Sequence, residues 1–276
     1  MEFTKYTGLG NDFVFLDGQT ALSVADPNTL AKRLCDRRFG IGADGLVLLL
    51  PSKEADVRMR IINSDGSEAE MCGNASRCVP LHLLSRGKIP KKQIVLETLA
   101  GKIQTEVIDL AKGLVRVDMG RPHLLRGEIP IQGNPYEQAI NIPLEVKGKT
   151  WSGTAVSMGN PHFVIFVDDI AKIDVADWGP LIETHPAFPR KTNVEFVQIL
   201  DERNVRMRVW ERGAGITQAC GTGACATAVS CVLNQKTVPE ITVHLDGGNL
   251  QIQWRDKQEV WMTGPAKEVF RGEIDL

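Results

Sequence analysis

The chain lacks an excess of charge of either sign. It has 32 Lys and Arg against 34 Asp and Glu, which leaves a net charge of −2 in 276 residues. The basic residues are scattered, so the positive patch expected of a nucleic-acid-binding surface is missing. Apolar runs are short as well, and none approaches the length needed to cross a membrane. We therefore expect a protein that binds neither nucleic acid nor a membrane.

The sequence also lacks a secretion signal and a metal-binding cysteine pattern. Its first residues, MEFTKYTGLGNDF, contain no apolar signal-peptide core, which predicts a cytoplasmic protein with reduced cysteines. The six cysteines form no C-x-x-C pair, and no histidine stands at the spacing of a zinc finger. We therefore expect no metal site.

Two similar stretches are present in a composition that is otherwise ordinary for a globular protein. RMRIINSDGSEAEMCG begins at Arg58, and RMRVWERGAGITQACG begins at Arg206. Each contains strand-forming residues, a polar turn and a Cys-Gly pair at the start of an expected helix. The stretches are 148 residues apart, an offset that aligns Cys72 with Cys220.

The position of these two cysteines predicts their chemistry. A helix start has N–H groups without backbone partners and carries a partial positive charge. On this ground we expect Cys220 to have a depressed pKa and to be partly thiolate. The same N–H groups are suited to hold a carboxylate. Cys78, Cys225 and Cys231 fall inside the two helices and are expected to be small core residues.

Weaker echoes along the chain indicate that it contains an internal duplication. GNDFVFLD at Gly10–Asp17 is echoed by GNPHFVIFVDD at Gly159–Asp169, and further echoes follow in the same order with offsets of 144 to 149. The duplication also aligns polar residues, namely Asn11 with Asn160, Asp44 with Asn193, and Asn63 with Glu211. Any single Asn of this kind is more often a turn residue, but the whole set favours a shared cleft.

Hydrophobic periodicity predicts the secondary structure around these residues. The expected helices are 28–38, from residue 72 to about 84, and 224–232. The expected strands are 13–17, 46–50, 57–62, 94–98, 102–108, 114–119, 194–200 and 205–210. A segment rich in Gly, Pro and Asn, 120–135, marks the crossing into the second half.

Two thiols that face one cleft are suited to proton transfer at carbon. One cysteine, as thiolate, would remove the α-proton of an amino acid. The other, as thiol, would return a proton to the opposite face and so invert that carbon. The resulting carbanion needs preorganised stabilisation, part of which the two helix starts supply. The two thiols would titrate as a coupled pair.

Four motifs give the chain a family resemblance. GLGNDF at Gly8–Phe13, EMCGN at Glu70–Asn74, GNPH at Gly159–His162, and ERGAG with ACGTGA within 211–224 make it similar to the diaminopimelate epimerases. The resemblance covers nearly the whole chain. It implies an α+β fold of two similar, pseudo-symmetric domains, each a barrel-like β-sheet around a central helix. We expect residues 1–120 plus about 265–276 to form the domain carrying Cys72, and residues 121–264 to form the domain carrying Cys220.

The resemblance also implies a function. Members of this family are cofactor-independent isomerases that interconvert LL- and meso-2,6-diaminopimelate in lysine biosynthesis, without pyridoxal phosphate. It makes Cys72 and Cys220 the catalytic bases. It further implies a small-molecule substrate, no cofactor and no metal, and it is compatible with a homodimer.

By the same resemblance, both halves contribute to substrate binding. The implied residues are Asn11, Asp44, Asn63, Gly73, Asn74, Asn160, Asn193, Glu211, Arg212, Gly221 and Thr222. Within this set, a backbone cradle for the reacting carboxylate corresponds to Gly73, Asn74, Gly221 and Thr222. The groups around the distal carboxylate correspond to Asn63, Asn160, Asn193 and Arg212. Catalytic support is implied for His162 and Glu211. The chain departs from the common family pattern at Asp44, where many relatives carry Gln, at Ala75-Ser76, and at Ile216.

Three alternatives are weighed against this hypothesis. A racemase or epimerase of another amino acid, of the proline or hydroxyproline type, would use the same two-cysteine chemistry but needs no site for a second carboxylate. Arg212 favours a dicarboxylate, because guanidinium binds carboxylate in a bidentate fork. A non-catalytic amino-acid-binding protein would not need both thiols. A thiol-redox protein is disfavoured by the wide separation of the cysteines.

Overall fold

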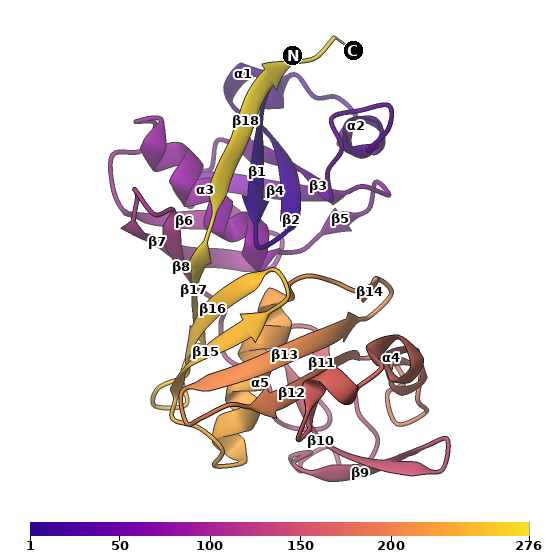
Figure 1. The fold of residues 1–276 in the computed structure, drawn as a ribbon. Coiled ribbons are helices and arrows are strands. Elements are labelled where there is room, and N and C mark those ends of the chain that lie inside the picture. The colour runs from indigo at the N-terminus through magenta and orange to yellow at the C-terminus, as the bar shows by residue number, and fades with distance from the viewer. Residues whose placement is uncertain (276) are drawn as a thin grey trace. The chain divides into compact units, whose positions relative to one another are not determined.

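The computed structural model describes residues 1–275 and divides the chain into two compact units. Unit 1 comprises Met1–Asp118 and the C-terminal segment from Thr263, and unit 2 comprises Met119–Met262 (Figure 1). The domain boundaries proposed from the sequence differ from these limits by only a few residues. Within residues 1–275, no helix is both long and apolar enough to span a bilayer.

Each unit consists mainly of β-strands that surround one central helix. The elements of unit 1 are β1 (Glu2–Gly8), β2 (Asn11–Leu16), α1 (Gly18–Leu22), α2 (Pro27–Cys35), β3 (Gly45–Leu50), β4 (Val57–Asn63), β5 (Glu68–Ala69), α3 (Gly73–Ser85), β6 (Gln93–Thr98), β7 (Gly101–Asp109), β8 (Leu114–Asp118) and β18 (Lys267–Glu273). The elements of unit 2 are β9 (Ile142–Val146), β10 (Lys149–Ser157), β11 (Pro161–Phe166), η1 (Ile170–Lys172), α4 (Val175–Glu183), β12 (Asn193–Ile199), β13 (Asn204–Glu211), β14 (Gly215–Ile216), α5 (Gly221–Leu233), β15 (Glu240–Leu245) and β16 (Gly248–Gln253). The chain passes from unit 2 to unit 1 along β17 (Trp261–Pro265).

The strand pairing repeats between the units. In unit 1, β1–β2 is antiparallel, β2–β3 parallel, β3–β4 antiparallel, β4–β6 parallel and β6–β7 antiparallel. In unit 2, the pairs β10–β11, β11–β12, β12–β13, β13–β15 and β15–β16 follow the same order of directions. The duplication predicted from the sequence is therefore confirmed.

A buried helix lies at the centre of each unit (Figure 1). Every residue of α3 from Gly73 to Leu83 is buried, and the helix contacts β1, β6, β7, β8 and β18. In α5, only Thr222, Val232 and Leu233 are less than buried, and the helix contacts strands β10 to β13, β15 and β16. A helix that is apolar or small all round is stable only when it is covered on every side. The predicted α+β class with a central helix in each unit is confirmed.

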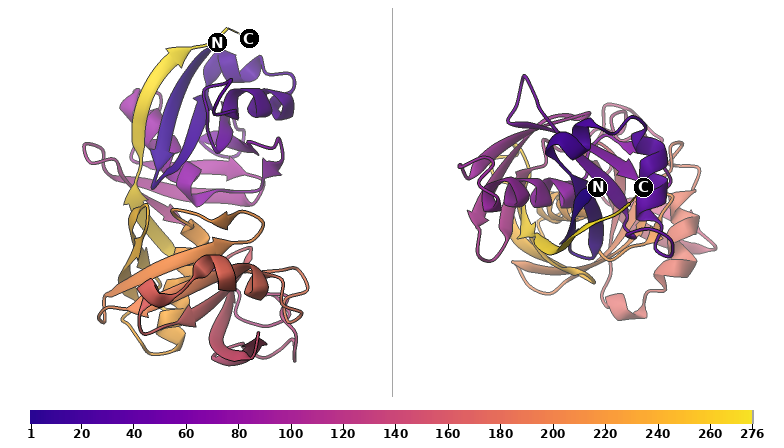
Figure 2. Two further views of the ribbon diagram at one scale, coloured as in Figure 1. Left: turned by 45° about the vertical axis from the view of Figure 1, so that its right-hand side comes forward. Right: turned by 90° about the horizontal axis from the view of Figure 1, so that it is seen from above.

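The C-terminal strand β18 completes the sheet of unit 1. It pairs antiparallel with β1, whose other edge pairs with β2 (Figures 1 and 2). The sequence analysis assigned the C-terminal segment to the first domain but identified neither β1 nor β18 as a strand. Tyr6 of β1 donates a hydrogen bond to Glu268 Oε2 of β18 over 3.1 Å, which adds a side-chain contact to the backbone pairing.

Several predicted boundaries differ from the structure. The helix predicted at 28–38 is α2, which begins at Pro27 and ends at Cys35, because the Asp36 carboxylate accepts from the N–H groups of the next turn and redirects the chain. The helix predicted at 224–232 begins three residues earlier, at Gly221.

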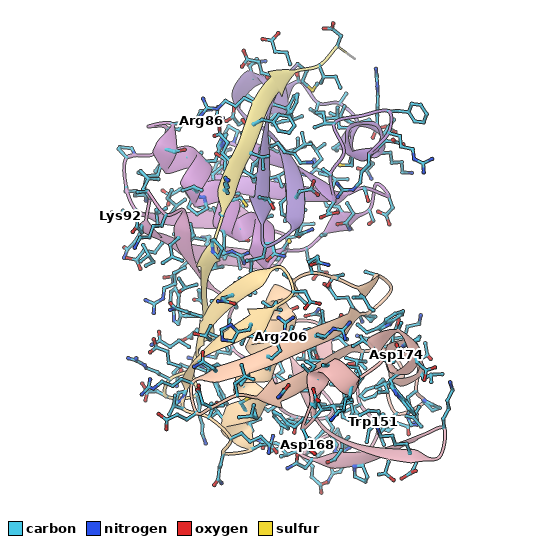
Figure 3. The ribbon with its side chains drawn as sticks, viewed as in Figure 1. Arg86, Lys92, Trp151, Asp168, Asp174 and Arg206 are labelled. Atoms are coloured by element: carbon cyan, nitrogen blue, oxygen red, sulfur yellow. The ribbon has the colours of Figure 1, made fainter. Side chains whose placement is uncertain are left out.

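The sequence analysis did not identify α4. This helix begins after Asp174, labelled in Figure 3, whose carboxylate accepts from the N–H groups of Ala176 and Asp177. Trp178 of α4 packs edge-on against Trp151 of β10, with ring centroids 5.1 Å apart. This contact attaches the helix to the core of unit 2.

Candidate active site

Each unit presents an asparagine from a glycine turn. Gly10 and Gly159 have positive φ angles of 86° and 94°, a conformation that glycine adopts without strain. The turns place Asn11 at the start of β2 and Asn160 just before β11. The matched turn geometry explains why both copies of the repeat read Gly-Asn.

In unit 1, the asparagine lies at the start of the central helix. Cys72 is the N-cap of α3, as predicted, and its φ and ψ of −142° and 114° are extended. The Oδ1 atom of Asn11 accepts from Cys72 Sγ over 3.8 Å and from Asn74 Nδ2 over 3.3 Å. Three of the predicted site residues therefore form one hydrogen-bonded group.

Asp44 joins this group from the loop that precedes β3. Its Oδ2 atom accepts from Asn11 Nδ2 over 2.5 Å, and its Oδ1 atom lies 2.7 Å from Arg37. Arg37 also binds Asp12. The negative charge of Asp44, which stands where many relatives have a neutral Gln, is therefore compensated by an arginine within the same unit.

Asn63 lies beside this group without bonding to it directly. It ends β4 opposite Gly45, and its Nδ2 atom donates to Ser67 over 2.9 Å. The next residue, Ser64, donates its N–H to the Asp44 carbonyl. The structure thus brings Asn63 to the same edge of unit 1 as the other predicted residues.

In unit 2, Cys220 occupies the matching position as the N-cap of α5. Its Sγ atom accepts from the N–H of Gly223 over 3.4 Å and lies 3.6 Å from the hydroxyl of Thr222. The thiol is almost fully buried, with 5% of the residue exposed. The predicted helix-start geometry is confirmed for both cysteines.

The predicted acidity of Cys220 is wrong. Burial raises the pKa of its thiol well above the usual value, and the nearby carboxylates of Glu211 and Glu195 raise it further. The hydrogen bonds from Thr222 and Gly223 act in the opposite direction but are smaller. A helix start depresses a cysteine pKa when the sulfur is in a positive, partly exposed setting, and this sulfur is neither exposed nor far from negative charge. Burial and the two carboxylates thus favour the protonated thiol of Cys220 over its thiolate.

Glu211 lies next to this thiol. Burial raises the pKa of its carboxyl, and the hydrogen bond from the Thr217 hydroxyl opposes that rise. The backbone of Glu211 pairs with Gly215, the first residue of the two-residue strand β14. The second residue of β14, Ile216, has an exposed side chain. The residue that departs from the family pattern here thus points away from the buried carboxyl.

His162 and Asn160 form a second polar group beside Cys220. His162 Nδ1 lies 2.7 Å from Glu195 Oε1, and His162 Nε2 lies 3.0 Å from Asn160 Oδ1. Asn160 Nδ2 donates to Thr222 Oγ1 over 3.3 Å. The side chains of His162 and Glu195 are both fully buried.

Asn193 holds the loop that carries Arg212. Its Nδ2 atom donates to the Pro161 carbonyl over 2.7 Å, and its Oδ1 atom accepts from the Arg212 N–H over 2.9 Å. The exposed guanidinium of Arg212 donates to the Arg190 carbonyl over 3.1 Å. Asn193 was predicted as a contact to a distal carboxylate, and its bonds here also give it a role in placing the arginine.

Glu183 supports the same loop from α4. This buried carboxylate accepts from the indole N–H of Trp210 over 2.7 Å and from the N–H of Gly213 over 3.2 Å. The two acceptors fix the chain on either side of Glu211 and Arg212.

We expect Glu183→Gln to loosen this loop. The amide keeps one acceptor oxygen and loses the other, so a buried donor is left unpaired at a cost of about 1–3 kcal/mol. The free energy of unfolding should fall by that amount and KM should rise, while kcat changes less. Denaturant unfolding and steady-state kinetics measure both quantities. Glu202→Gln, at an exposed carboxylate of the same unit, is the matched control, and equal behaviour of the two variants would contradict the bracing role.

No metal site is apparent: residues 1–275 contain no group of three or more His, Cys, Asp or Glu side chains arranged to hold an ion.

Sequence reasoning missed Glu195, Glu183, Thr217 and Arg37. Glu195 left a signal, because a carboxylate inside the apolar strand 194–200 is anomalous and charged residues are seldom fully buried without a partner. The other three are ordinary polar residues in sequence, and only tertiary contacts give them a role.

Comparisons with known proteins identify what the chain is similar to. The family model described as Diaminopimelate epimerase matches residues 3–125 and 154–269. A diaminopimelate epimerase of Carboxydothermus hydrogenoformans is 58% identical over 278 residues, covering 100% of both chains. One from Pelotomaculum thermopropionicum is 56% identical and covers 99% of this chain and 98% of its own.

Solved structures show a similar fold at low identity. A hydroxyproline epimerase from Agrobacterium vitis, with trans-4-hydroxy-L-proline bound, has a TM-score of 0.68 at 16% identity, covering 99% of this chain and 91% of its own. A probable proline racemase from Agrobacterium radiobacter has a TM-score of 0.70 at 17% identity, covering 100% and 93%. A phenazine biosynthesis protein from Bacillus anthracis reaches 0.72 at 16% identity, covering 100% and 99%.

Proposed function

Because the chain belongs to the diaminopimelate epimerase family, we propose that it inverts one α-carbon of 2,6-diaminopimelate, using Cys72 and Cys220 as its acid–base pair. The chain is an isomerase that interconverts the LL and meso forms, a step of lysine biosynthesis. The observation that carries the two-cysteine mechanism is the duplication itself, since each unit has a cysteine as the N-cap of its buried central helix.

The helix starts are suited to the reacting carboxylate. The N–H groups of Gly73 and Asn74 in α3, and of Gly221 and Thr222 in α5, belong to first turns, where backbone donors have no partner within the helix. Such groups bind anions, and they also stabilise the negative charge that develops as the α-proton leaves. The roles of these four residues support the proposal but rest on resemblance and position.

The protonation state of Cys220 bears on which cysteine removes the α-proton and which returns a proton. The raised pKa of Cys220 favours its protonated form, which suits the step that returns a proton to the carbanion. In the reaction direction that begins with Cys220 protonated, Cys72 is then the base that removes the α-proton. In the reverse reaction the two roles exchange. Glu211, hydrogen-bonded to Cys220, supports this transfer, and His162 is a second proposed support.

The distal carboxylate distinguishes this substrate from a monocarboxylate. Arg212, on a loop fixed by Asn193 and Glu183, is the proposed partner for it, with Asn63 and Asn160 completing the contacts. A racemase of a proline-type substrate would have no use for this cation. The family match and the high identity to epimerases of diaminopimelate favour the dicarboxylate.

We further propose a cytoplasmic protein, because reactive thiols need a reducing compartment. Units 1 and 2 are the proposed N- and C-terminal domains. A homodimer and the absence of a nucleic-acid partner are parts of the same proposal, the second supported by the balanced charge of the chain.

The test is turnover of LL-diaminopimelate in deuterated water. We expect meso product that carries solvent deuterium at the inverted carbon before the remaining substrate does, because separate groups serve the two faces. Treatment with hydroxylamine, which removes pyridoxal phosphate, should leave the rate unchanged. Inversion of proline or hydroxyproline without turnover of diaminopimelate would select the alternative racemase.

A further inference from the structure

Glu195 is a fully buried carboxylate that no proposed step of the reaction uses. It lies in β12 between Val194 and Phe196, both also buried. Its Oε1 atom contacts His162 Nδ1 at 2.7 Å, and within residues 1–275 its Oε2 atom has no hydrogen-bond partner. A charged group in such a place is costly unless it is paired, so its contact with His162 is what makes the position tolerable.

The hydrogen bonds around His162 determine where its protons lie. Asn160 uses its amide N–H₂ to donate to Thr222, so its Oδ1 atom faces His162 Nε2. This oxygen, 3.0 Å away, can only accept, so the contact is a hydrogen bond in the tautomer that carries a hydrogen on Nε2. The 2.7 Å contact on the other side requires one more hydrogen, shared between Nδ1 and Oε1.

The hydrogen bonds continue in one direction from His162 to the sulfur of Cys220. His162 donates to Asn160, and Asn160 donates to Thr222. Because the Thr222 oxygen accepts from Asn160, its own hydrogen is available for Cys220 Sγ, which lies 3.6 Å away. The Gly223 N–H donates to the same sulfur. When Nε2 of His162 carries the hydrogen and the Thr222 hydroxyl donates to Sγ, every donor in this series points toward Cys220.

Gly223 leaves the space that Glu195 occupies. A Cβ atom at residue 223 would lie 2.7 Å from Glu195 Oε1 and 3.2 Å from Cys220 Sγ. The carboxylate is thus packed against the first turn of α5, next to the sulfur that the series of hydrogen bonds reaches.

We propose that Glu195 is a positioning residue, which holds His162 so that the series His162–Asn160–Thr222 presents a hydrogen-bond donor to the Cys220 sulfur. The inference rests on the proposed role of Cys220, and it assigns to Glu195 a part that acts through the other three side chains, beside the direct effect of its charge on the thiol. A donor on the sulfur favours the thiolate that forms each time Cys220 gives up its proton. It therefore counteracts burial and the carboxylates of Glu195 and Glu211.

Two substitutions separate positioning from charge. In Glu195→Gln, the amide N–H₂ donates to His162 Nδ1, which leaves the hydrogen on Nε2 and the direction of the series unchanged. In Glu195→Leu, the side chain has similar size but no partner for the ring, so Nε2 loses its fixed hydrogen. Glu195→Leu removes the series and should lower kcat/KM at least about tenfold. Glu195→Gln should keep most of the wild-type kcat/KM. Equal losses in the two variants would show that the charge matters and not the direction, and would overturn the proposal.

A double-mutant cycle tests whether the effect passes through Thr222. Thr222→Val removes the hydroxyl at nearly constant shape, and Thr222→Ser is its control because it keeps the donor. If the series is the route, Glu195→Leu should cost little more in the Thr222→Val background, since the donor on the sulfur is already gone. Additive losses would mean that Glu195 acts independently of Thr222, against the proposal.

A substrate-free measurement keeps this inference separate from the proposed function. In protein labelled with ¹⁵N-histidine, the wild type should show a protonated Nε2 on His162, assigned by its absence in His162→Gln. The signal should persist in Glu195→Gln and be replaced by mixed tautomers in Glu195→Leu. An unprotonated Nε2 in the wild type sinks the proposal even if diaminopimelate is turned over. A protonated Nε2 without turnover of diaminopimelate would instead contradict the proposed substrate. Should Glu195→Leu fail to fold, the wild-type spectrum, Glu195→Gln and Thr222→Val still decide the matter.

Discussion

Alanine at Cys72 or at Cys220 should each reduce epimerisation by roughly a hundredfold to ten-thousandfold, the usual contribution of one positioned acid or base. The loss is large in both variants because inversion needs a group on each face of the carbon. Removing either one leaves the proton with no acceptor or the carbanion with no donor. The measurement is kcat/KM in both directions, from the LL and from the meso isomer.

The chain provides matched controls for this experiment in the same two helices. Cys78 of α3 and Cys231 of α5 are fully buried, and burial raises the pKa of each thiol to about 12. Cys78→Ala and Cys231→Ala should lower stability through a small cavity and leave the chemistry largely intact. If either control lost as much activity as Cys72→Ala or Cys220→Ala, the catalytic assignment would lose its support.

A serine at one position extends the test. Elimination of a hydrogen halide from a halogenated analogue requires only one base, so Cys220→Ser should retain part of that reaction while inversion is lost. Normal epimerisation by this variant would falsify the two-base mechanism.

Replacing Arg212 with methionine should lower kcat/KM for diaminopimelate by roughly tenfold to a hundredfold, since a hydrogen bond to a charged group contributes about 1.5–3 kcal/mol. Methionine keeps much of the length of the side chain but leaves the distal carboxylate without its cation. Arg212→Lys should fall between the two, because an ammonium keeps the charge and loses the planar fork. Most of the effect is expected in KM, since the distal carboxylate that Arg212 is proposed to bind keeps its charge throughout the reaction.

Arg203→Met is the control for nonspecific loss of positive charge, because Arg203 is an exposed arginine of the same unit. A second control uses the substrate. Slow exchange of the α-proton in a monocarboxylate amino acid should be nearly unchanged in Arg212→Met, since that molecule has no distal carboxylate. Wild-type turnover of diaminopimelate by Arg212→Met would remove the distal-carboxylate assignment and favour the proline-type racemase.

Much of the site could be read from local sequence. A cysteine followed by glycine after a polar turn specifies a helix start within a few residues, and the structure has that start at Gly73 and Gly221. The Gly-Asn turns at Asn11 and Asn160 are equally local, because only the glycine allows the positive φ that precedes each asparagine. The repeat then predicted the matching order of strands.

The acidity of Cys220 could not be read in this way. It depends on burial and on the carboxylates of Glu195 in β12 and Glu211 in β13, and only the tertiary fold places both of them beside the sulfur. The helix α4 was missed for a different reason. It is only nine residues long and has Pro180 inside it, so its own sequence is a weak helix signal. Packing of Trp178 and the two hydrogen bonds of Glu183 give this short helix support that its own sequence does not provide.

The pairing of β18 with β1 sets an order of assembly during synthesis. The ribosome makes β1 early and β18 only after the whole of unit 2 has been made. Until then β1 has one unpaired edge, while unit 2, which is continuous in sequence, already has all its strands. The half of the protein that is translated first is therefore the half that is completed last, and Cys72 gains its finished surroundings only as the chain nears its end.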